Sequence, residues 1–419
     1  MNGSAALVEG VTEEAATAPI GLSARFSRAE FAELRRRTVF ECGKWDPQYE
    51  DECVLADFAL TLEPTTWREL ALLAEQLARE TLAAERELLA RPELHPRLGL
   101  PRAIRRCLGA HEARGAACGA ARVMRFDFHW TRAGWQVSEV NSDVPGGFIE
   151  ASGFSALAAR MLGLQLAGDP TEALVEAVVR AVGEDGRVAL VHATAYTDDR
   201  QVMLHLARAL EVRGLATGLL DPTQVLWRDG QAGAATSWFD GPIDLLLRFF
   251  PAEWLPNTRA QGDWRAFFVG SRTPISNPGA ALLVQSKRFP LVWAELCTEL
   301  PTWRALLPET RSPRDADWRG DDGWILKPAL GRVGEDIGLR GVVGTREWQG
   351  IARAARWWPA HWVAQRRFEA VALEHEGEAL YPCLGVYVID GRAAGIYGRV
   401  ARRPLIDSRA RDVPVLVLT

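Results

Sequence analysis

Residues 121–141, ARVMRFDFHWTRAGWQVSEVN, contain the pattern that decides the fold. Apolar and polar residues alternate through 123–130 and again through 134–141, as they do in a β-strand with one buried face. The polar segment TRAG lies between these stretches and ends at Gly134, as a short turn does. The sequence therefore predicts a β-hairpin here.

The alternation also predicts which side chains share a face of each strand. In the first strand, one face carries Arg125, Asp127 and His129, and the other carries Met124, Phe126 and Phe128. In the second strand, one face carries Trp135, Val137, Glu139 and Asn141, and the other carries Gln136, Ser138 and Val140. Each strand thus presents two polar residues that are two positions apart.

Four polar residues of this hairpin have the chemistry of a magnesium and phosphate site: Arg125, Asp127, Glu139 and Asn141. Carboxylate and amide oxygens are hard ligands that suit Mg²⁺, which completes its shell with water and phosphate oxygens. The guanidinium of Arg125 would neutralise a phosphoryl group during transfer. A solvated polar face of an ordinary hairpin is the alternative, and the hairpin alone does not exclude it.

After the hairpin, the chain alternates between helices and strands. Helical patterns cover 149–162, 172–182 and 198–214, and buried strands are expected at 187–193, 215–220 and 242–250. This alternation is typical of a mostly parallel sheet. We therefore expect a compact α/β domain between Gly186 and Leu283.

Helices are also expected before the hairpin. An amphipathic pattern covers 26–37, and a second begins near Thr65, with Glu69 placed for a capping box, and ends before Pro92. In the last third we expect a strand, a glycine loop and a strand in 323–340, a helix in 345–358, and strands in 361–371, 381–391 and 392–400. A hairpin turn is expected at the DG pair, 390–391.

The basic residues are very unevenly divided between arginine and lysine. Of 49 basic residues only three are lysine: Lys44, Lys287 and Lys327. A site that needs a compact ammonium cannot use the broad guanidinium fork, so a retained lysine indicates such a site. Lys287 precedes a predicted helix, and Lys327 precedes a loop containing Gly331 and Gly334, so both are candidates for phosphate contacts. Glycine spacing alone favours an ordinary hairpin loop. Lys44 has no such context, and we expect a solvated surface group.

Composition argues against several classes of function. The net charge of −5, with both signs interspersed, disfavours binding of nucleic acid by phosphate neutralisation. No apolar run reaches the roughly 18 residues of a membrane span. Residues 1–20 lack the regions of a secretory signal, so we expect a disordered leader and a cytoplasmic protein. The six cysteines lack metal-binding spacing and are expected to be reduced, and Met124, Cys297 and the 16 tryptophans to lie in the core or a pocket.

Several motifs occur together in a fixed order: RFDFHW with VSEVNSDVPGGFIEA (125–151), SNPGAALLVQSKRFPLVW (276–293), WILKPALGRVGEDI (324–337), and VAQRRFEAV with YPCLGVYVIDGRAAGIYGRV (363–400). In this order they resemble the ATP-grasp synthetase domain of the glutathionylspermidine synthase family. KWDPQYEDECVLADF (44–58) and the helix after it resemble that family's amino-terminal region, so the resemblance begins near residue 22. It implies an α/β (α+β) ATP-grasp fold with a pre-ATP-grasp-like α/β domain, permuted as in glutathionylspermidine and glutathione synthetases.

The resemblance also implies an activity and its residues. It implies an ADP-forming carboxylate–amine ligase that uses ATP and Mg²⁺, joining a small-molecule or peptide carboxylate to an amine acceptor through an acyl phosphate. The implied roles are metal binding for Asp127, Glu139 and Asn141; catalysis for Arg125 and Arg399; and nucleotide binding for Lys287, Lys327, Gly331, Gly334 and Gln365. The implied regions are a leader (1–20), a helical region with the metal hairpin (21–170), a substrate-binding α/β domain (171–285) and a nucleotide-binding region (286–419).

Two departures from the family pattern leave other functions open. The loop at 331–334 reads GRVG where the family usually has GREG, and no acid follows Arg399. A non-catalytic nucleotide-binding or partner-binding descendant is one alternative, and a tailoring ligase acting on a peptide or small natural product is another. The substrates and the oligomeric state are not readable. The amine needs an acidic anchor, and the candidates are Asp143, Glu150, Asp198 and Asp199.

Overall fold

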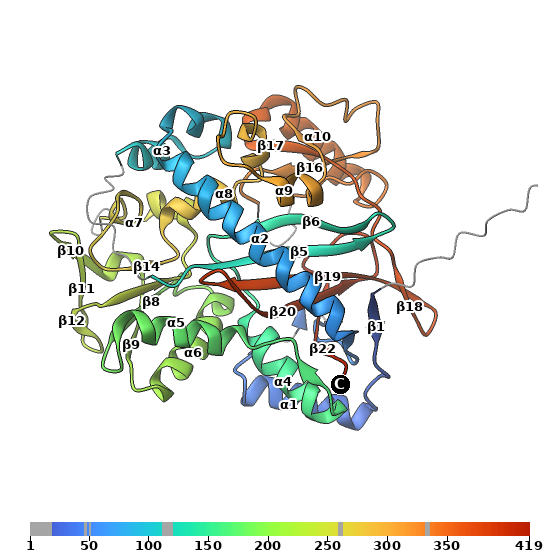
Figure 1. Cartoon of the computed structure of the whole chain (residues 1–419), viewed down its shortest axis with the longest axis horizontal. Helices are drawn as coiled ribbons and strands as arrows, with labels where there is room; N and C mark the ends of the chain where they lie inside the picture. Colours follow the sequence, from blue (N-terminus) through green and yellow to red (C-terminus); the bar gives the residue numbers. More distant parts are fainter. Residues whose placement is uncertain (1–18, 46–47, 50–51, 111–119, 259–262, 332–335) are drawn as a thin grey trace, which may run out of the picture.

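The computed structural model describes residues 19–45, 48–49, 52–110, 120–258, 263–331 and 336–419. Its centre is an antiparallel sheet, which the long helix α2 crosses and beside which a parallel sheet lies (Figure 1). The mixed α/β class is the predicted one. The predicted leader and most of the GRVG loop lie outside the described residues.

The central sheet joins the predicted hairpin to the end of the chain, because β19 pairs with both β5 and β20. Its strand order is β21-β20-β19-β5-β6. The strands are β5 (Val123–Thr131), β6 (Gly134–Asn141), β19 (Glu378–Ile389), β20 (Arg392–Ala401) and β21 (Arg411–Val413), and β18 (Leu373–His375) pairs with β19. The DG turn is confirmed, since Asp390 and Gly391 both have positive φ between β19 and β20.

The predicted faces of β6 are wrong in one respect. Asp127 lies opposite Glu139, but Phe128 lies opposite Val137, so the register shifts by one residue at Ser138. This β-bulge resets the alternation. Val137, like Trp135, packs in the hydrophobic core, whereas Glu139 stays on the polar face.

Helix α2 (Pro64–Leu89) covers the apolar face of the central sheet. Its buried side chains recur three or four positions apart and pack in the same core as Phe126 and Phe128. The start is close to the predicted one, but the capping box is wrong, since the residue at the N-cap is Glu63 and its side chain makes no capping bond. Helix α1 (Arg28–Phe40) does have a capping box, formed by Ser27 and Glu30.

The predicted parallel sheet is confirmed. Its order is β14-β13-β8-β9, and every neighbouring pair is parallel. Its elements are β8 (Arg187–Val191), β9 (Ala216–Leu220), β13 (Leu245–Arg248) and β14 (Ile275–Ser276), with α5 (Pro170–Val182) and α6 (Thr197–Val212). The helices pack on one face of this sheet through a second hydrophobic core.

A third sheet carries the predicted nucleotide lysine. Its order is β15-β17-β16, and α10 (Thr345–Trp357) packs on it. The strands are β15 (Thr310–Arg311), β16 (Trp324–Pro328) and β17 (Trp362–Arg366). No named strand follows the glycine loop within described residues 336–340, where one isolated bridge, Leu326 to Gly338, replaces the expected strand.

A fourth sheet ties the two ends of the described chain together, because β22 lies between β4 and β7. Its strands are β1 (Ile20–Leu22), β4 (Leu60–Leu62), β7 (Gln165–Leu166) and β22 (Val415–Val417). The remaining elements are β2 (Gln48–Tyr49), β3 (Glu52–Cys53), α3 (Arg102–Gly109), α4 (Ser155–Leu162), β10 (Val225–Arg228), β11 (Gln231–Ala235), β12 (Asp240–Pro242), α7 (Ala266–Val269), α8 (Leu282–Gln285) and α9 (Pro301–Leu306). The region boundaries at 170 and 285 stay a prediction.

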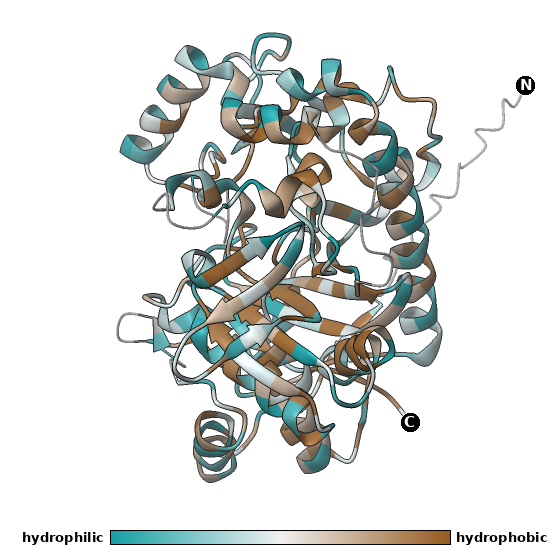
Figure 2. Ribbon diagram, turned by 90° about the vertical axis from the view of Figure 1, so that its left-hand side faces the viewer, coloured by the Kyte–Doolittle hydropathy of each residue, from teal (hydrophilic) through white to brown (hydrophobic). Residues whose placement is uncertain are grey.

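The surface departs from the composition-based expectations at a few positions. Hydrophobic stretches concentrate in the central strands, and the outer helices show hydrophilic turns (Figure 2). Five described cysteines are free, but Cys297 is exposed rather than buried. The exposed tryptophans are Trp45, Trp238, Trp357 and Trp358. No helix in the described part is long and apolar enough to cross a membrane.

Asp143, a candidate anchor for the amine, is instead part of the scaffold. Its carboxylate pairs with Arg248 of β13, and both side chains are fully buried. The same carboxylate accepts a hydrogen bond of 3.0 Å from the backbone N–H of Ala252. The pair therefore fixes the loop after β6 to the parallel sheet, and neither group is available to a substrate.

We expect Asp143→Ala to lower the free energy of unfolding by about 3–5 kcal/mol, because it leaves the buried Arg248 without a counter-charge. Urea denaturation measures the loss. Glu374→Ala, at an exposed position of β18, is the control and should change stability by about 0.5 kcal/mol or less. A loss no larger than that of the control would contradict the role of the pair.

Candidate active site

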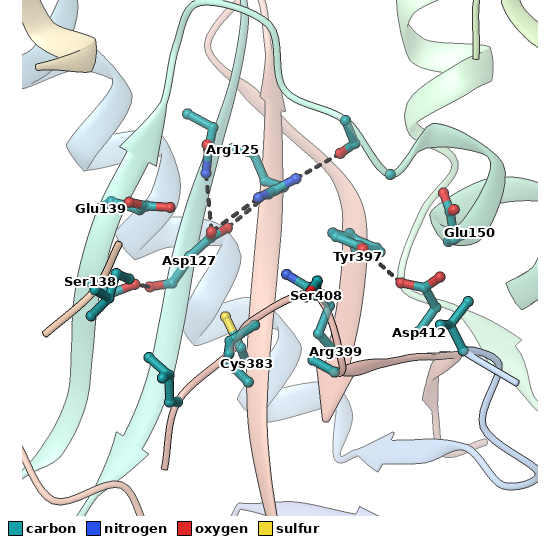
Figure 3. A pocket seen from close by; sticks show the side chains of 18 of the residues that line it. Arg125, Asp127, Ser138, Glu139, Glu150, Cys383, Tyr397, Arg399, Ser408 and Asp412 are labelled. Carbon is teal, nitrogen blue, oxygen red and sulfur yellow. Dashed lines mark hydrogen bonds and ion pairs between the residues drawn. The ribbon is translucent and has the colours of Figure 1, made fainter. Parts of the chain in front are cut away.

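A cavity of about 650 Å³ lies over the polar face of the central sheet. Figure 3 shows Glu139, Asp127 and Arg125 toward one end, Tyr397 and Arg399 in the middle, and Glu150 and Asp412 at the other end. The predicted site residues that line it are Arg125, Asp127, Glu139, Asn141, Lys327 and Arg399. The cavity therefore gathers residues from three segments of the chain, two of them on the central sheet and one, with Lys327, on the third sheet.

Asp127 is the centre of the hydrogen-bond network on the hairpin. Arg125 donates to both of its oxygens, at 2.8 Å and 3.0 Å (Figure 3). Asn141 donates to it from the amide nitrogen at 3.0 Å. Arg125 also donates to the carbonyl oxygen of Gly146 at 2.7 Å. Side-chain hydrogen bonds therefore hold this polar face in place. The alternative interpretation required a solvated face, which the structure does not show.

Glu139 brings the two predicted nucleotide lysines together electrostatically. Its carboxylate lies 3.0 Å from Nζ of Lys287. Burial alone would raise the pKa of Glu139, but the ammonium groups of Lys287 and Lys327 lower it to about 2. Glu139 is therefore ionised at neutral pH. Burial lowers the pKa of Lys327 to about 8, against the opposite effect of Glu139.

Gln365, which is not part of the cavity wall, binds the Lys327 side chain. The Lys327 ammonium donates to Oε1 of Gln365 at 2.7 Å and to the carbonyl oxygen of Ser138 at 3.3 Å. Lys287 donates in the same way to the carbonyl oxygen of Gly331 at 2.8 Å. Among the described residues, Lys287, Gly331 and Gln365 are not part of the cavity wall. Their nucleotide roles stay predictions, and Gly334 lies outside the described residues.

His129 continues the polar face of β5 as predicted. Burial lowers its pKa to about 4, so the imidazole is neutral at physiological pH. One ring nitrogen lies 3.1 Å from the hydroxyl of Ser138, and the ring packs on Phe368 at 5.0 Å between centroids. These contacts suit a side chain that shapes the cavity without adding charge.

Arg399 reaches the middle of the cavity from β20. Its guanidinium donates to the carbonyl oxygen of Asp407, which holds it beside the loop after β20. Cys383 lies opposite it on β19, and burial raises the pKa of this thiol, so the group stays protonated. Tyr397 supports Arg125, whose guanidinium lies 5.0 Å from the centre of the ring.

The prediction for Lys44 is wrong. Its side chain is buried rather than solvated, and it lines the same cavity. Nζ contacts a carboxylate oxygen of Glu150 and lies 3.1 Å from Oδ2 of Asp412. Burial alone would lower the pKa of Lys44, but the two carboxylates raise it above its usual range. All three lysines of the chain therefore lie in or against one cavity.

The donor set of the hairpin fits a magnesium ion. The carboxylates of Asp127 and Glu139 are directly opposite each other on paired strands, and Asn141 uses its amide nitrogen for Asp127, which leaves its amide oxygen for another partner. Two carboxylates and one amide oxygen match the ligands that Mg²⁺ takes when phosphates complete its shell. No group of three or more His, Cys, Asp or Glu in the described ranges is placed for a metal ion, so the amide is needed.

Tyr397 and Asp412 also line the cavity, and no pattern in the sequence assigned either of them to a site. Their connection is a hydrogen bond of 2.7 Å from the phenol of Tyr397 to Oδ1 of Asp412. Tyr397 lies in the 381–400 motif but was given no role there, and Asp412 lies beyond the last motif. The rarity of lysine did mark Lys44, and it was the loop context that led to the wrong interpretation.

Comparison with known proteins gives the family. The sequence model described as glutathionylspermidine synthase pre-ATP-grasp matches residues 37–418. The chain belongs to this family. The predicted resemblance is therefore confirmed, and the family match covers the hairpin, all three lysines and the Arg399 strand.

Two individual proteins are similar to the chain over different lengths. A protein of Haemophilus influenzae, provisionally named an acid–amine ligase, is 24% identical over 159 residues, 38% of this chain. The match spans only 37% of that relative's length. A solved structure from Methylobacillus flagellatus, provisionally named a gamma-glutamylcysteine synthetase, has 13% identity and a TM-score of 0.44, covering 81% of this chain and 88% of that one.

We expect Lys327→Arg and Lys287→Arg each to lower kcat/KM of the ligase reaction that the family resemblance implies. The loss should be at least about tenfold, although the charge is preserved. The Lys327 ammonium lies against oxygens of Gln365 and Ser138. The Lys287 ammonium lies against oxygens of Glu139 and Gly331. A planar guanidinium in either place would displace these oxygens. Steady-state kinetics measures the loss, and Arg314→Lys, an exposed position, is the control. Unchanged kcat/KM in both variants would contradict the need for a compact ammonium.

Proposed function

We propose that the protein is an ATP-dependent carboxylate–amine ligase that forms an amide bond through an acyl phosphate and releases ADP. One observation carries this proposal. A single cavity combines paired carboxylates, two arginines and a buried lysine on strands that the fold brings together. The names of the family and of the Haemophilus relative, which describe synthesis and acid–amine ligation, support it.

The balance of charge supports a nucleotide as the co-substrate. Around the hairpin, four cations face two carboxylates: Arg125, Lys287, Lys327 and Arg399 against Asp127 and Glu139. The excess of two positive charges matches the roughly two negative charges of a magnesium–ATP complex at neutral pH. Binding of that complex would leave the site close to neutral, which lowers the cost of burying its charges.

The residues of the chain supply position and charge rather than covalent chemistry. Bound Mg²⁺ would neutralise phosphate oxygens, and Asp127, Glu139 and Asn141 would hold it. Lys327 and Lys287 would contact the phosphates, and Lys287 would leave Glu139 to do so. Arg125 and Arg399, on neighbouring parts of the sheet, would stabilise the charge that develops as the carboxylate attacks the γ-phosphorus.

The carboxylate and the amine are proposed only as classes. The carboxylate oxygen attacks the γ-phosphorus and ADP leaves; the amine then attacks the acyl carbon and phosphate leaves, with one proton lost from nitrogen. The carboxylate belongs to a small molecule or a peptide. We assign no role to nucleic acid or membranes, and we propose a cytoplasmic location because the reaction consumes ATP.

We expect nucleotide affinity to fall as the pH rises above about 8. Lys327 has a pKa of about 8 in the free protein, so it is charged below that value and neutral above it. The dissociation constant for ADP should therefore be about tenfold higher at about pH 9 than at about pH 7. Calorimetry measures it. Lys327→Arg, which stays charged, should show no such rise, and a rise of equal size in this variant would contradict the assignment.

We expect ADP release that depends on both a carboxylate and an amine when the protein is incubated with ATP and Mg²⁺. A coupled ADP assay over panels of both substrates, followed by mass spectrometry of the product, tests this. Asp127→Asn should reduce the rate by about 100-fold or more, since it removes a metal ligand and the partner of Arg125. Asp322→Asn, at an exposed site, is the matched control. Tight ATP binding without turnover on any pair would instead support a non-catalytic descendant.

A further inference from the structure

A crevice at one end of the parallel sheet opens into the cavity, and the proposed reaction gives it no role. The neighbouring strands β8 and β13 run parallel, but the chain leaves them in opposite directions. From β8 it continues through α6 to β9 on one side, and from β13 it continues to β14 on the other. In open parallel sheets, ligands bind outside the carboxyl ends of the strands at such a point.

The two segments that follow these strands form one wall of the cavity. Tyr196, directly before α6, lines the cavity from the β8 side, and Phe249 and Trp254 line it from the β13 side. We call these three side chains the aromatic wall. The backbone N–H groups of Phe249 and Phe250 both donate to the carbonyl oxygen of Val191, at 2.7 Å and 3.0 Å. Because Val191 ends β8, these bonds fix the two segments to each other before a ligand binds.

The aromatic wall leaves part of its ring surface open. The ring centroids of Tyr196 and Trp254 are 5.9 Å apart, with 35° between the planes. Tyr196 is 57% exposed, whereas Phe249 and Trp254 are partly buried. Trp254 is held by an edge contact with Phe250, at 6.2 Å between centroids. Aromatic rings pair favourably in offset and edge contacts, so a further ring would be stabilised in this concave place.

Two acids beside the aromatic wall restrict the charge of its ligand. Asp198 and Asp199, at the start of α6, also line the cavity. Their carboxylates disfavour an anionic group, and Lys327, the proposed phosphate contact, lies on a different sheet. Acids in the first turn of a helix are stabilised by the helix dipole, so α6 itself explains them. The helix does not explain the rings.

The aromatic wall lies next to the proposed reacting centre. A Cβ at Gly146 would be 3.8 Å from Cζ of Phe249, so this ring lies against the glycine. The carbonyl oxygen of Gly146 accepts a hydrogen bond of 2.7 Å from Arg125. A substrate whose reacting group lies at Arg125 can therefore place its body on the wall.

We propose that the aromatic wall is a specificity subsite for an uncharged aromatic ring of one of the two substrates. The ring lies in the crevice between the ends of β8 and β13, and the reacting group of the same molecule is directed toward Arg125. The contacts are the same whether the ring belongs to the carboxylate or to the amine, and the second arm of the test distinguishes these sources. This inference rests on the proposed ligase function and adds a substrate class to it.

The first arm measures binding without activity. Benzamide, which is planar and uncharged, is the probe, and ligand-observed NMR gives its Kd. The Kd should be millimolar, and at least about fivefold lower than that of cyclohexanecarboxamide, a non-planar analogue of similar size. ADP with Mg²⁺ should leave it unchanged. Displacement of benzamide by ADP would overturn the proposal, since the ring would then occupy the nucleotide site.

Matched variants locate the bound ring. Trp254→Ala should raise the Kd of benzamide at least about tenfold. Tyr196→Ala, at an exposed position, should raise it at least about threefold, and it keeps the test decisive if Trp254→Ala does not fold. Trp357→Ala removes a tryptophan that is 67% exposed and outside the cavity wall, and it should leave the Kd unchanged. An unchanged Kd in the folded variants of the wall would overturn the proposal.

A cation held by the rings and the two acids is the competing occupant. Tetramethylammonium is the probe for it, and it should not displace benzamide from the wild type. If tetramethylammonium binds in place of benzamide, and Asp198→Asn with Asp199→Asn removes its binding, the aromatic wall is a cation site and the inference is overturned.

The second arm measures substrate preference. Phenylacetate is compared with cyclohexylacetate, using the amine that the ADP assay identifies, and benzylamine with cyclohexylmethylamine, using the carboxylate that it identifies. In one of the two comparisons, kcat/KM should be at least about tenfold higher for the aromatic compound, and Trp254→Ala should remove the preference. That comparison shows which substrate carries the ring.

No preference for the aromatic compound in either comparison, or a preference that Trp254→Ala leaves intact, would overturn the inference. Absence of ADP release with every pair would refute the ligase function itself. Benzamide binding would then still test the aromatic wall, so the two failures are distinguishable.

Discussion

The pairing of β5 with β19 is the interaction on which the other features depend. It joins the hairpin of β5 and β6, which carries the proposed metal ligands, to β19, which carries Cys383. The next strand, β20, carries Arg399. Gly385 lies directly opposite Asp127, and a Cβ at this glycine would be 2.7 Å from Cδ of Arg125. The absence of a side chain at Gly385 therefore leaves room for the Arg125–Asp127 pair. Because α2 covers the apolar face, the polar face is the one that opens to the cavity.

The cavity is organised by compensated charge. Isolated buried charges are unfavourable, and ion pairs in such places rarely stabilise a fold compared with apolar packing. Here Asp127 has Arg125, Glu139 has Lys287, and Glu150 with Asp412 has Lys44. Asp143 with Arg248 shows the purely structural use of the same device, because neither side chain reaches solvent. The pairs at the cavity differ from this structural pair, because a charged ligand could replace one of the two partners. In the proposed function, a phosphate would replace Glu139 as the partner of Lys287.

Much of the fold was predictable from periodicity, since it depends on local patterns. The hairpin at β5 and β6, the parallel strands and the DG turn all follow from alternation and turn residues. The side that Val137 takes was not predictable, because the bulge at Ser138 depends on the partner strand. The strand expected after the glycine loop fails for a similar reason, since pairing there is limited to one bridge at Gly338.

The site was predictable where the chemistry is local and unpredictable where it is assembled over distance. Arg125, Asp127, Glu139 and Asn141 share one hairpin, so strand alternation brings them together. The buried position of Lys44 was not predictable without the fold, because its partners come from the helical turn after β6 and from β21. Its loop context suggested solvent, whereas its rarity as a lysine gave the better indication.

A crystal structure grown with Mg²⁺ and a non-hydrolysable ATP analogue tests the central assignment most directly. We expect the metal to be held by Asp127, Glu139 and Asn141, the phosphates to lie against Lys327, and Lys287 to have exchanged Glu139 for a phosphate oxygen. A nucleotide bound elsewhere, with the Lys287–Glu139 pair intact and other residues holding the metal, would contradict the assignment of this face as an ATP site.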